Sequence, residues 1–128
     1  MRLLLDTHAF LWWIWDDPRL TPVVRSALSD PTTTAFVSAA SAWEIATKVR
    51  IGKLPNASAL CDRLAETVHL AGFESLPVGL EHARAAGLMP GEHKDPFDRM
   101  IAAQARLDGL TVVTADPAIA ALGALVLW

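Results

Sequence analysis

The amino-acid sequence predicts an α/β fold in which a mostly parallel sheet of about five strands carries helices on both faces. Short apolar segments with the composition of strands alternate along the chain with helical segments. Parallel neighbours in a sheet are joined by such helical crossovers. With 128 residues, of which 52% are hydrophobic, the chain has the size of one domain with one core. We find no internal repeat or domain boundary, and expect a single domain over residues 1–128.

Five segments have the character of strands. The first is a run of leucines that ends at Asp6, and the second contains Phe36 and Val37. Pro77 lies within the third, which therefore belongs at a sheet edge or ends early. The expected strands cover residues 2–5, 33–38, 73–78, 111–114 and 124–127.

The helices between these strands carry recognisable start and stop signals. Thr21-Pro22 and Asp95-Pro96 each offer a capping residue followed by proline at the first helical position. Apolar residues recur at helical spacing between residues 58 and 71, and Gly72 closes that segment. The expected helices cover residues 7–15, 21–29, 41–51, 58–71, 80–86 and 95–107, with a short last helix after Asp116 and a loop over residues 88–94.

Composition excludes several classes of protein. The single cysteine, Cys61, rules out an internal disulfide framework, and the longest apolar stretch, residues 9–15, is far shorter than the roughly 20 residues that span a bilayer. Asp6 interrupts the apolar N-terminus, and no cleavage site of a signal peptide follows. We therefore expect a cytoplasmic protein without a membrane span. The net charge of −3 lacks the overall basicity typical of nucleic-acid binders.

Four acids stand where ligands bind in parallel sheets, beyond the carboxyl ends of the strands. Asp6 follows the first strand and Asp116 the fourth, while Glu44 and Asp98 are expected in the first turns of two helices. Clustered carboxylates stay ionised only if a cation neutralises them. Carboxylates without a Cys or His pattern favour Mg²⁺ or Mn²⁺, ions that activate water for phosphodiester hydrolysis. The set predicts a metal-dependent hydrolytic site.

Each acid taken alone also has a structural interpretation. Ser41 and Glu44 have the spacing of a capping box, and Asp98 stands where an acid complements the helix dipole. Asp116 has capping chemistry, whereas Asp6, at the end of a leucine strand, has the weakest structural explanation. Capping and metal binding can coexist at one helix N-terminus.

With the four acids in order, the chain resembles the PIN-domain family, and within it the VapC-like toxins of type II toxin–antitoxin systems. Leu4-Leu5-Asp6-Thr7-His8 resembles the opening strand and first acid of that family, and Ser41-Ala42-Trp43-Glu44-Ile45 its second motif. The segment 93–105, from His93 to Ala105, resembles the most distinctive stretch of one VapC subgroup. Residues 110–116 resemble the closing strand and fourth acid. The resemblance covers the whole chain in order.

This resemblance implies a Mg²⁺-dependent endoribonuclease with a three-layer α/β/α sandwich, usually a homodimer. It also implies a co-expressed VapB-like antitoxin whose tail occupies the active-site groove. Carried over position by position, Asp6 and Asp98 are expected to bind the metal directly, and Glu44 and Asp116 through water or by holding the attacking water. The residues expected to hydrogen-bond these carboxylates or the scissile phosphate are Thr7, Ser41 and Thr114. Asp95 is expected to cap its helix.

Other polar and aromatic residues keep two interpretations. Arg99 is placed either to contact phosphate or to pair with Asp95 or Asp98. The basic residues after Glu44 either follow an RNA backbone or form a solvated face; they are Lys48, Arg50 and Lys53. Three tryptophans lie too close together in the sequence for all to face inward, so we expect at least one at the surface; they are Trp12, Trp13 and Trp15. For this cluster, core packing or a protein contact is favoured over stacking on bases. We interpret His8 and His93 as local hydrogen-bonding residues.

Three other functions compete with the toxin. A non-catalytic RNA- or nucleotide-binding domain of the same fold would use the acids as caps, which four intact acids argue against. A phosphatase with Asp6 as nucleophile commonly has a second acid two residues later, where this chain has His8. A housekeeping RNA-processing nuclease is the third. The small size and the lack of an added RNA-binding domain favour the toxin.

Overall fold

A parallel sheet of five strands forms the centre of the molecule, as expected from the sequence. The computed structural model describes residues 1–92 and 94–128. The strand order is β3-β2-β1-β4-β5, and every pair of neighbours is parallel. The strands are β1 (Arg2–Leu5), β2 (Thr34–Ser38), β3 (Glu74–Leu76), β4 (Thr111–Val113) and β5 (Val126–Leu127). The first strand therefore lies in the middle of the sheet, with Leu5 opposite both Val37 and Val113.

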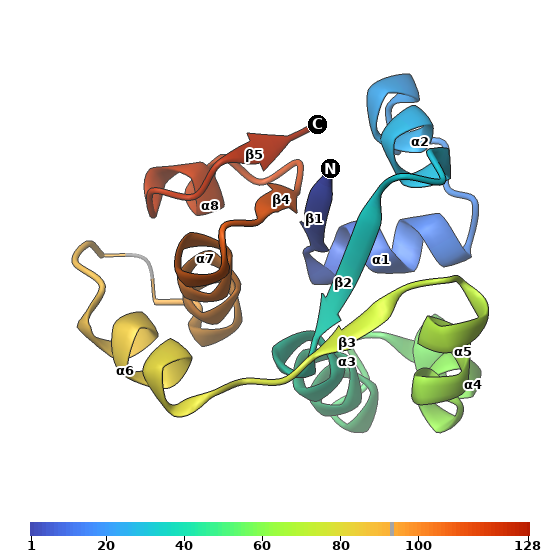
Figure 1. Cartoon of the computed structure of the whole chain (residues 1–128). Helices are drawn as coiled ribbons and strands as arrows, with labels where there is room; N and C mark the ends of the chain where they lie inside the picture. Colours follow the sequence, from blue (N-terminus) through green and yellow to red (C-terminus); the bar gives the residue numbers. More distant parts are fainter. Residues whose placement is uncertain (93) are drawn as a thin grey trace.

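Helices cover both faces of this sheet (Figure 1). In chain order they are α1 (Thr7–Ile14), α2 (Pro22–Ser29), α3 (Ala39–Arg50), the 3₁₀ turn η1 (Pro55–Ala57), α4 (Ser58–Asp62), α5 (Leu64–Leu70), α6 (Leu80–Leu88), α7 (Pro96–Asp108) and α8 (Pro117–Ala121). None of the helices in these described ranges combines the length and the apolar character that crossing a membrane would need.

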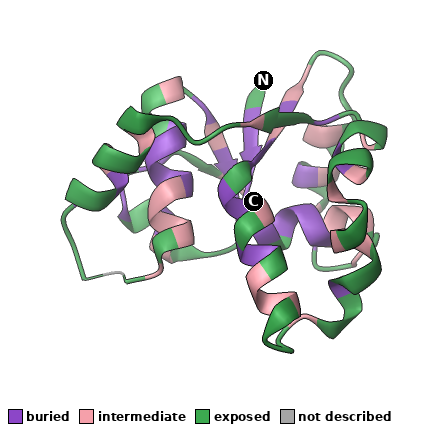
Figure 2. Cartoon of the chain, turned by 90° about the horizontal axis from the view of Figure 1, so that it is seen from below, coloured by how far each residue is buried: buried purple, intermediate pink, exposed green. Residues whose placement is uncertain are grey.

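Alternation along β1 divides the apolar interior into two halves. Leu3 and Leu5 pack into one cluster, with residues of α1, α2, α3 and α5. Leu4 points to the opposite face and packs with residues of α6, α7 and α8, as side chains alternate across a strand. All three leucines are fully buried, and Figure 2 shows buried segments in the central strands and on the helices beside them. The result is three layers with β1 at the centre.

Two expected helices differ in the structure. The single helix expected over residues 58–71 is wrong: α4 and α5 are separated at Arg63, whose φ of −127° and ψ of 33° are not helical. The helix expected over residues 41–51 starts at Ala39, because the Ser38 hydroxyl accepts a hydrogen bond from the Ala40 N–H and caps the helix there. The third strand lies at the sheet edge and ends before Pro77, as predicted.

The tryptophans near the N-terminus divide between contacts and surface. The Trp12 ring lies 5.6 Å from that of Trp128, and the Arg19 guanidinium stacks on it at 4.4 Å. Trp13 packs against Phe73, with ring centroids 6.2 Å apart. Trp15 is 39% exposed, which confirms that at least one of the three reaches the surface.

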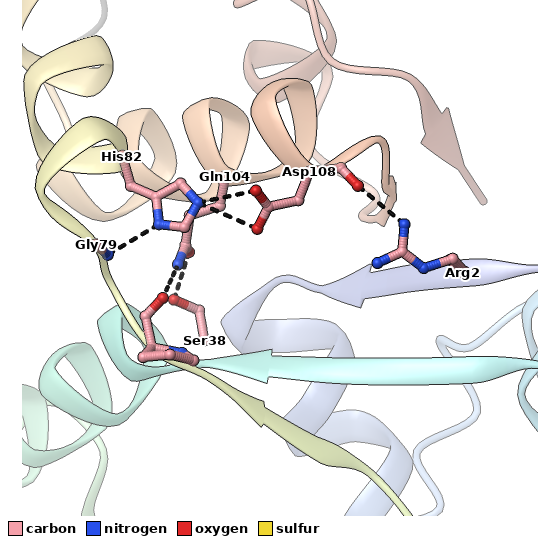
Figure 3. A network of polar contacts seen from close by, with 7 residues as sticks. Arg2, Ser38, Gly79, His82, Gln104 and Asp108 are labelled. Carbon is pink, nitrogen blue, oxygen red and sulfur yellow. Dashed lines mark hydrogen bonds and ion pairs between the residues drawn. The ribbon is translucent and has the colours of Figure 1, made fainter.

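Polar contacts join α6, α7 and the sheet (Figure 3), and the bond between Ser38 and Gln104 is buried. Ser38 donates to Gln104 Oε1 at 2.6 Å, and Gln104 Nε2 donates to the Pro77 carbonyl at 3.1 Å. The Gly79 N–H donates to His82 Nδ1, so the proton of the neutral ring is on Nε2, which donates to the Asp108 carboxylate at 3.1 Å. These bonds fix α7, which carries one of the four acids, against the sheet.

Candidate active site

Asp6 lies at the point where β1 ends and α1 begins. Its side chain is 6% exposed and is held at both oxygens. Oδ1 accepts from the Ala9 N–H at 2.8 Å, and Oδ2 accepts from the Thr114 hydroxyl at 2.6 Å. Asp6 therefore caps α1, a structural role that the sequence indicated less strongly than for the other three acids. The two bonds also fix the orientation of its carboxylate.

Burial changes the proton affinity of this carboxyl group. Desolvation raises the pKa of Asp6 above its usual value, and the nearby charge of Asp98 raises it further. The hydrogen bonds from Thr114 and Ala9, together with the charge of His8, oppose this rise in pKa. The balance disfavours the ionised form, so a bound cation would stabilise the carboxylate.

Glu44 is a second buried acid, 4% exposed, and lies in the second turn of α3. Its Oε1 accepts from the Thr7 hydroxyl at 2.6 Å, and Thr7 Oγ1 lies 3.0 Å from Oγ of Ser41. The capping-box interpretation of Ser41 and Glu44 is wrong, because α3 begins at Ala39 and both residues are inside the helix. The expectation that Glu44 lies in the first turn of this helix is wrong for the same reason.

Lys48 is the ion-pair partner of Glu44. Its Nζ lies 2.5 Å from Glu44 Oε2, one helical turn away. Neither of the two interpretations of Lys48, an RNA contact or a solvated face, included this pair. The spacing of four residues on one helix was the signal in the sequence that would have indicated it.

Asp98 lies in the first turn of α7, as expected. Asp95 caps this helix by accepting from the N–H groups of Phe97 at 2.9 Å and Asp98 at 3.3 Å, which confirms its predicted role. Asp98 is half-buried and close enough to Asp6 to raise the pKa of that residue. The two acids therefore lie near each other, although they come from different elements.

Asp116 is the most peripheral of the four acids. It is exposed and caps α8, where its Oδ1 accepts from the Ala118 N–H at 2.9 Å. Its own N–H donates to the Thr114 hydroxyl at 2.9 Å. Thr114 thus links the backbone of Asp116 to the carboxylate of Asp6.

Hydroxyl groups connect three of the four acids, Asp6, Glu44 and Asp116, and the carboxylates do not form a closed shell. Thr114 connects Asp6 with Asp116, and Thr7, the residue after Asp6, connects to Glu44. Within residues 1–92 and 94–128, no group of three or more His, Cys, Asp or Glu side chains is arranged to hold a metal ion. A cation at this site would therefore be held by fewer carboxylates than the four that the sequence offers.

The side chain of Arg99 extends toward the end of α6. Its Nε donates to the Ala86 carbonyl at 3.2 Å, and its Nη2 donates to the Met89 carbonyl. These bonds tie α7 to α6, which is a role beside the two that the sequence suggested. His8 is exposed, with its ring 5.8 Å from that of Trp12. His93 lies outside the described residues.

Several solved structures have a fold similar to that of this chain. One chain of VapBC2 from Rickettsia felis, bound to a DNA fragment from their promoter, is similar with a TM-score of 0.72 and 16% identity, over 99% of this chain and 98% of that chain. FitAcB from Neisseria gonorrhoeae is similar with a TM-score of 0.65 and 26% identity, over 98% of this chain and 96% of that chain. For VapBC-1 from nontypeable Haemophilus influenzae the TM-score is 0.67 and the identity 15%, over 99% of this chain and 97% of that chain.

A search of the curated proteins finds no match. The model of the PIN domain, in contrast, matches residues 3–125. This match includes all four acids and the first four strands, apart from Arg2 at the start of β1, whereas β5 begins one residue after the match ends. The chain belongs to the PIN domain family.

Proposed function

We propose that this chain is the toxin of a type II toxin–antitoxin pair and acts as a Mg²⁺-dependent endoribonuclease at the site around Asp6. PIN domains are generally nucleases, which supports the class of reaction. The observation that carries the proposal is the buried Asp6 carboxylate, whose pKa is raised by burial and by the facing charge of Asp98. Two carboxylates in such a position need a cation to remain ionised together.

The residues of this site fit a hard divalent cation. Each Asp6 oxygen accepts one hydrogen bond and keeps lone-pair capacity for a metal. Mg²⁺ is commonly held by one or two carboxylates and several waters, so Asp6 and Asp98 suffice as direct ligands, and Mn²⁺ has the same preference for oxygen. Glu44 and Asp116 would then bind the metal through water.

The surrounding side chains have distinct roles in this proposal. A bound Mg²⁺ lowers the pKa of water and stabilises the charge that develops in a phosphodiester displacement. Thr114 orients Asp6, while Thr7 and Lys48 orient Glu44 to hold the attacking water by a hydrogen bond. Ser41 supports Thr7. Arg99 positions α7, and with it Asp98, through the carbonyl groups of α6.

The similar structures of VapBC2, FitAcB and VapBC-1 support the toxin assignment. By this similarity we propose a VapB-like antitoxin as the protein partner, a homodimeric state and a cytoplasmic place of action. The substrate in the proposal is RNA, in line with the resemblance noted from the sequence.

Cleavage of total RNA by the purified protein tests the proposed chemistry. We expect cleavage with Mg²⁺, none with EDTA, and none for Asp6→Asn or Asp98→Asn under the same conditions. Asp95→Asn is the matched control, because it changes an acid three residues from Asp98 while asparagine caps a helix as well as aspartate does. Full activity of both site variants would overturn the assignment of the site.

Growth on induction tests the toxin assignment separately. Induction of the wild-type chain should arrest growth, and induction of Asp98→Asn should not. Co-expression of the cognate VapB-like antitoxin should restore growth to the strain that makes the wild-type chain. A wild-type chain that cleaves RNA without affecting growth would instead indicate a housekeeping RNA-processing nuclease.

A further inference from the structure

A small apolar hollow lies between the starts of α3 and α7, and the proposed chemistry does not use it. It encloses about 220 Å³ and is lined by Trp43, Val78, Phe97 and Met100, together with small residues at the starts of the two helices. Within the described ranges, none of the side chains that line it is charged. The lining offers no charged group to a phosphate or a metal ion, whereas a flat apolar ring can pack against it.

Trp43 is held in the hollow in one orientation but remains open to solvent. Its ring centroid lies 4.9 Å from that of Phe97, and the two planes meet at 76°, an edge-to-face contact. Even so, Trp43 is 62% exposed. An indole that is fixed on one side and uncovered on the other loses little conformational freedom when a ligand stacks on it.

The hollow adjoins the acidic site through both helices. Trp43 directly precedes Glu44 on α3, and Phe97 directly precedes Asp98 on α7. Glu44 accepts a hydrogen bond from Thr7, and Asp98 is close enough to Asp6 to affect its pKa. The rings of Trp43 and Phe97, which precede these two acids, contact each other. A nucleotide whose phosphate is at the acids would therefore have a neighbouring base within reach of the indole.

We propose that this hollow binds one nucleobase of a single-stranded RNA, stacked on Trp43, next to the scissile phosphate. The inference rests on the proposed function, because it assumes that RNA is the substrate of the acidic site. Every base has a π-face, and the apolar lining offers few hydrogen bonds that would distinguish one base from another. The hollow thus selects an unpaired base over a paired one, and is tolerant of its identity.

RNA binding by single-residue variants tests this inference. The probe is a fluorescein-labelled 12-nucleotide RNA of mixed sequence, measured by anisotropy at fixed salt with EDTA, beside the same RNA with abasic riboses at its central positions. Trp43→Ala should weaken binding of the intact RNA about 5- to 100-fold, whereas Trp43→Phe should retain most of the affinity. Trp15→Ala is the matched control, an exposed tryptophan at the far end of α1, and should bind as the wild type does.

The abasic RNA should bind weakly, and equally to the wild type and Trp43→Ala. Unchanged affinity of Trp43→Ala for intact RNA, or an equal loss for both RNAs, would overturn the inference. So would a change in the molar mass of Trp43→Ala by light scattering, which would make the hollow a contact between copies of this chain. Thermal unfolding of each variant verifies that it is folded.

The two proposals fail in different ways. RNA that binds through Trp43 but is not cut when Mg²⁺ is added would contradict the nuclease and leave the stacking site standing. RNA that is cut with Mg²⁺ but binds equally well to the wild type and Trp43→Ala would contradict the stacking site and leave the nuclease standing.

Discussion

The hydroxyl of Thr114 donates a hydrogen bond of 2.6 Å to Oδ2 of Asp6, across 108 positions of the sequence. The bond joins the ends of β1 and β4, the two strands that lie side by side in the middle of the sheet. Thr114 also accepts from the Asp116 N–H, so one buried hydroxyl group organises two of the four acids. The first prediction concerns this hydroxyl.

Thr114→Val removes the hydroxyl group while keeping the shape of the side chain. Because a hydrogen bond to a carboxylate favours its ionised form, the pKa of Asp6 should rise further without it. The Mg²⁺ concentration for half-maximal RNA cleavage should increase by about 10- to 100-fold. Thr114→Ser, which keeps the hydroxyl, should stay close to the wild type, and the same Mg²⁺ dependence in all three proteins would contradict the role of this bond.

The raised pKa of Asp6 predicts how pH affects stability in the absence of metal. The folded state holds the Asp6 proton more tightly than the unfolded state, whose pKa is near 3.8. The contribution of Asp6 to stability is therefore complete below that value and is lost as pH rises through the folded pKa. The difference in melting temperature, wild type minus Asp6→Asn, should fall over this range.

Thermal unfolding in EDTA at a series of pH values measures this difference, and the subtraction removes the effects of other groups. One such group is Asp17, whose pKa is lowered to about 2 by its hydrogen bonds to Arg19. At neutral pH, Mg²⁺ should raise the melting temperature of the wild type but not that of Asp6→Asn. A pH-independent difference would mean that Asp6 does not titrate abnormally.

The ion pair between Lys48 and Glu44 predicts a coupled effect on stability. Lys48→Met removes the ion pair of the buried Glu44 carboxylate and keeps its hydrogen bond from Thr7. The free energy of unfolding should fall by about 1–3 kcal/mol. The double variant Lys48→Met/Glu44→Gln removes the uncompensated charge and should recover most of that loss. Urea unfolding of the two single variants and the double variant measures the coupling, and additive effects would argue against a functional pair.

Gln104 offers a prediction that separates stability from activity. It is fully buried and bonds both to Ser38 and to the Pro77 carbonyl. Gln104→Leu removes the acceptor of the Ser38 hydroxyl and the donor to the Pro77 carbonyl, and should cost about 1–3 kcal/mol in urea unfolding. Cleavage per folded molecule should change little, because the acids keep their own partners. A loss of activity without a loss of stability would place Gln104 in the substrate site.

Much of the fold follows from local signals in the sequence. The leucine run, the Thr21-Pro22 and Asp95-Pro96 starts, and the Pro77 edge signal each placed an element within one or two residues of its position. The start of α3 was misplaced because Ser38 and Ser41 both have capping chemistry. The choice between them depends on where β2 ends in the sheet.

Other features depend on tertiary packing and were not predictable from local pattern. Leu60, Leu64 and Val68 recur at helical spacing, yet two short helices separated at Arg63 pack the same side chains against one cluster. The positions of Asp6 and Asp116 after their strands were predicted. Their connection through Thr114 was not fixed by spacing, because it depends on the strand order, which places β4 directly beside β1.

The central place of β1 also affects when the site can form during synthesis. Asp6 is synthesised more than a hundred residues before Thr114, whose hydroxyl group orients it. Asp98, on α7, is likewise made late. A nascent chain that has not reached β4 therefore holds the first acid without the groups that complete its surroundings. For the nuclease proposed above, this order means that the site is incomplete until β4 and Thr114 have been made.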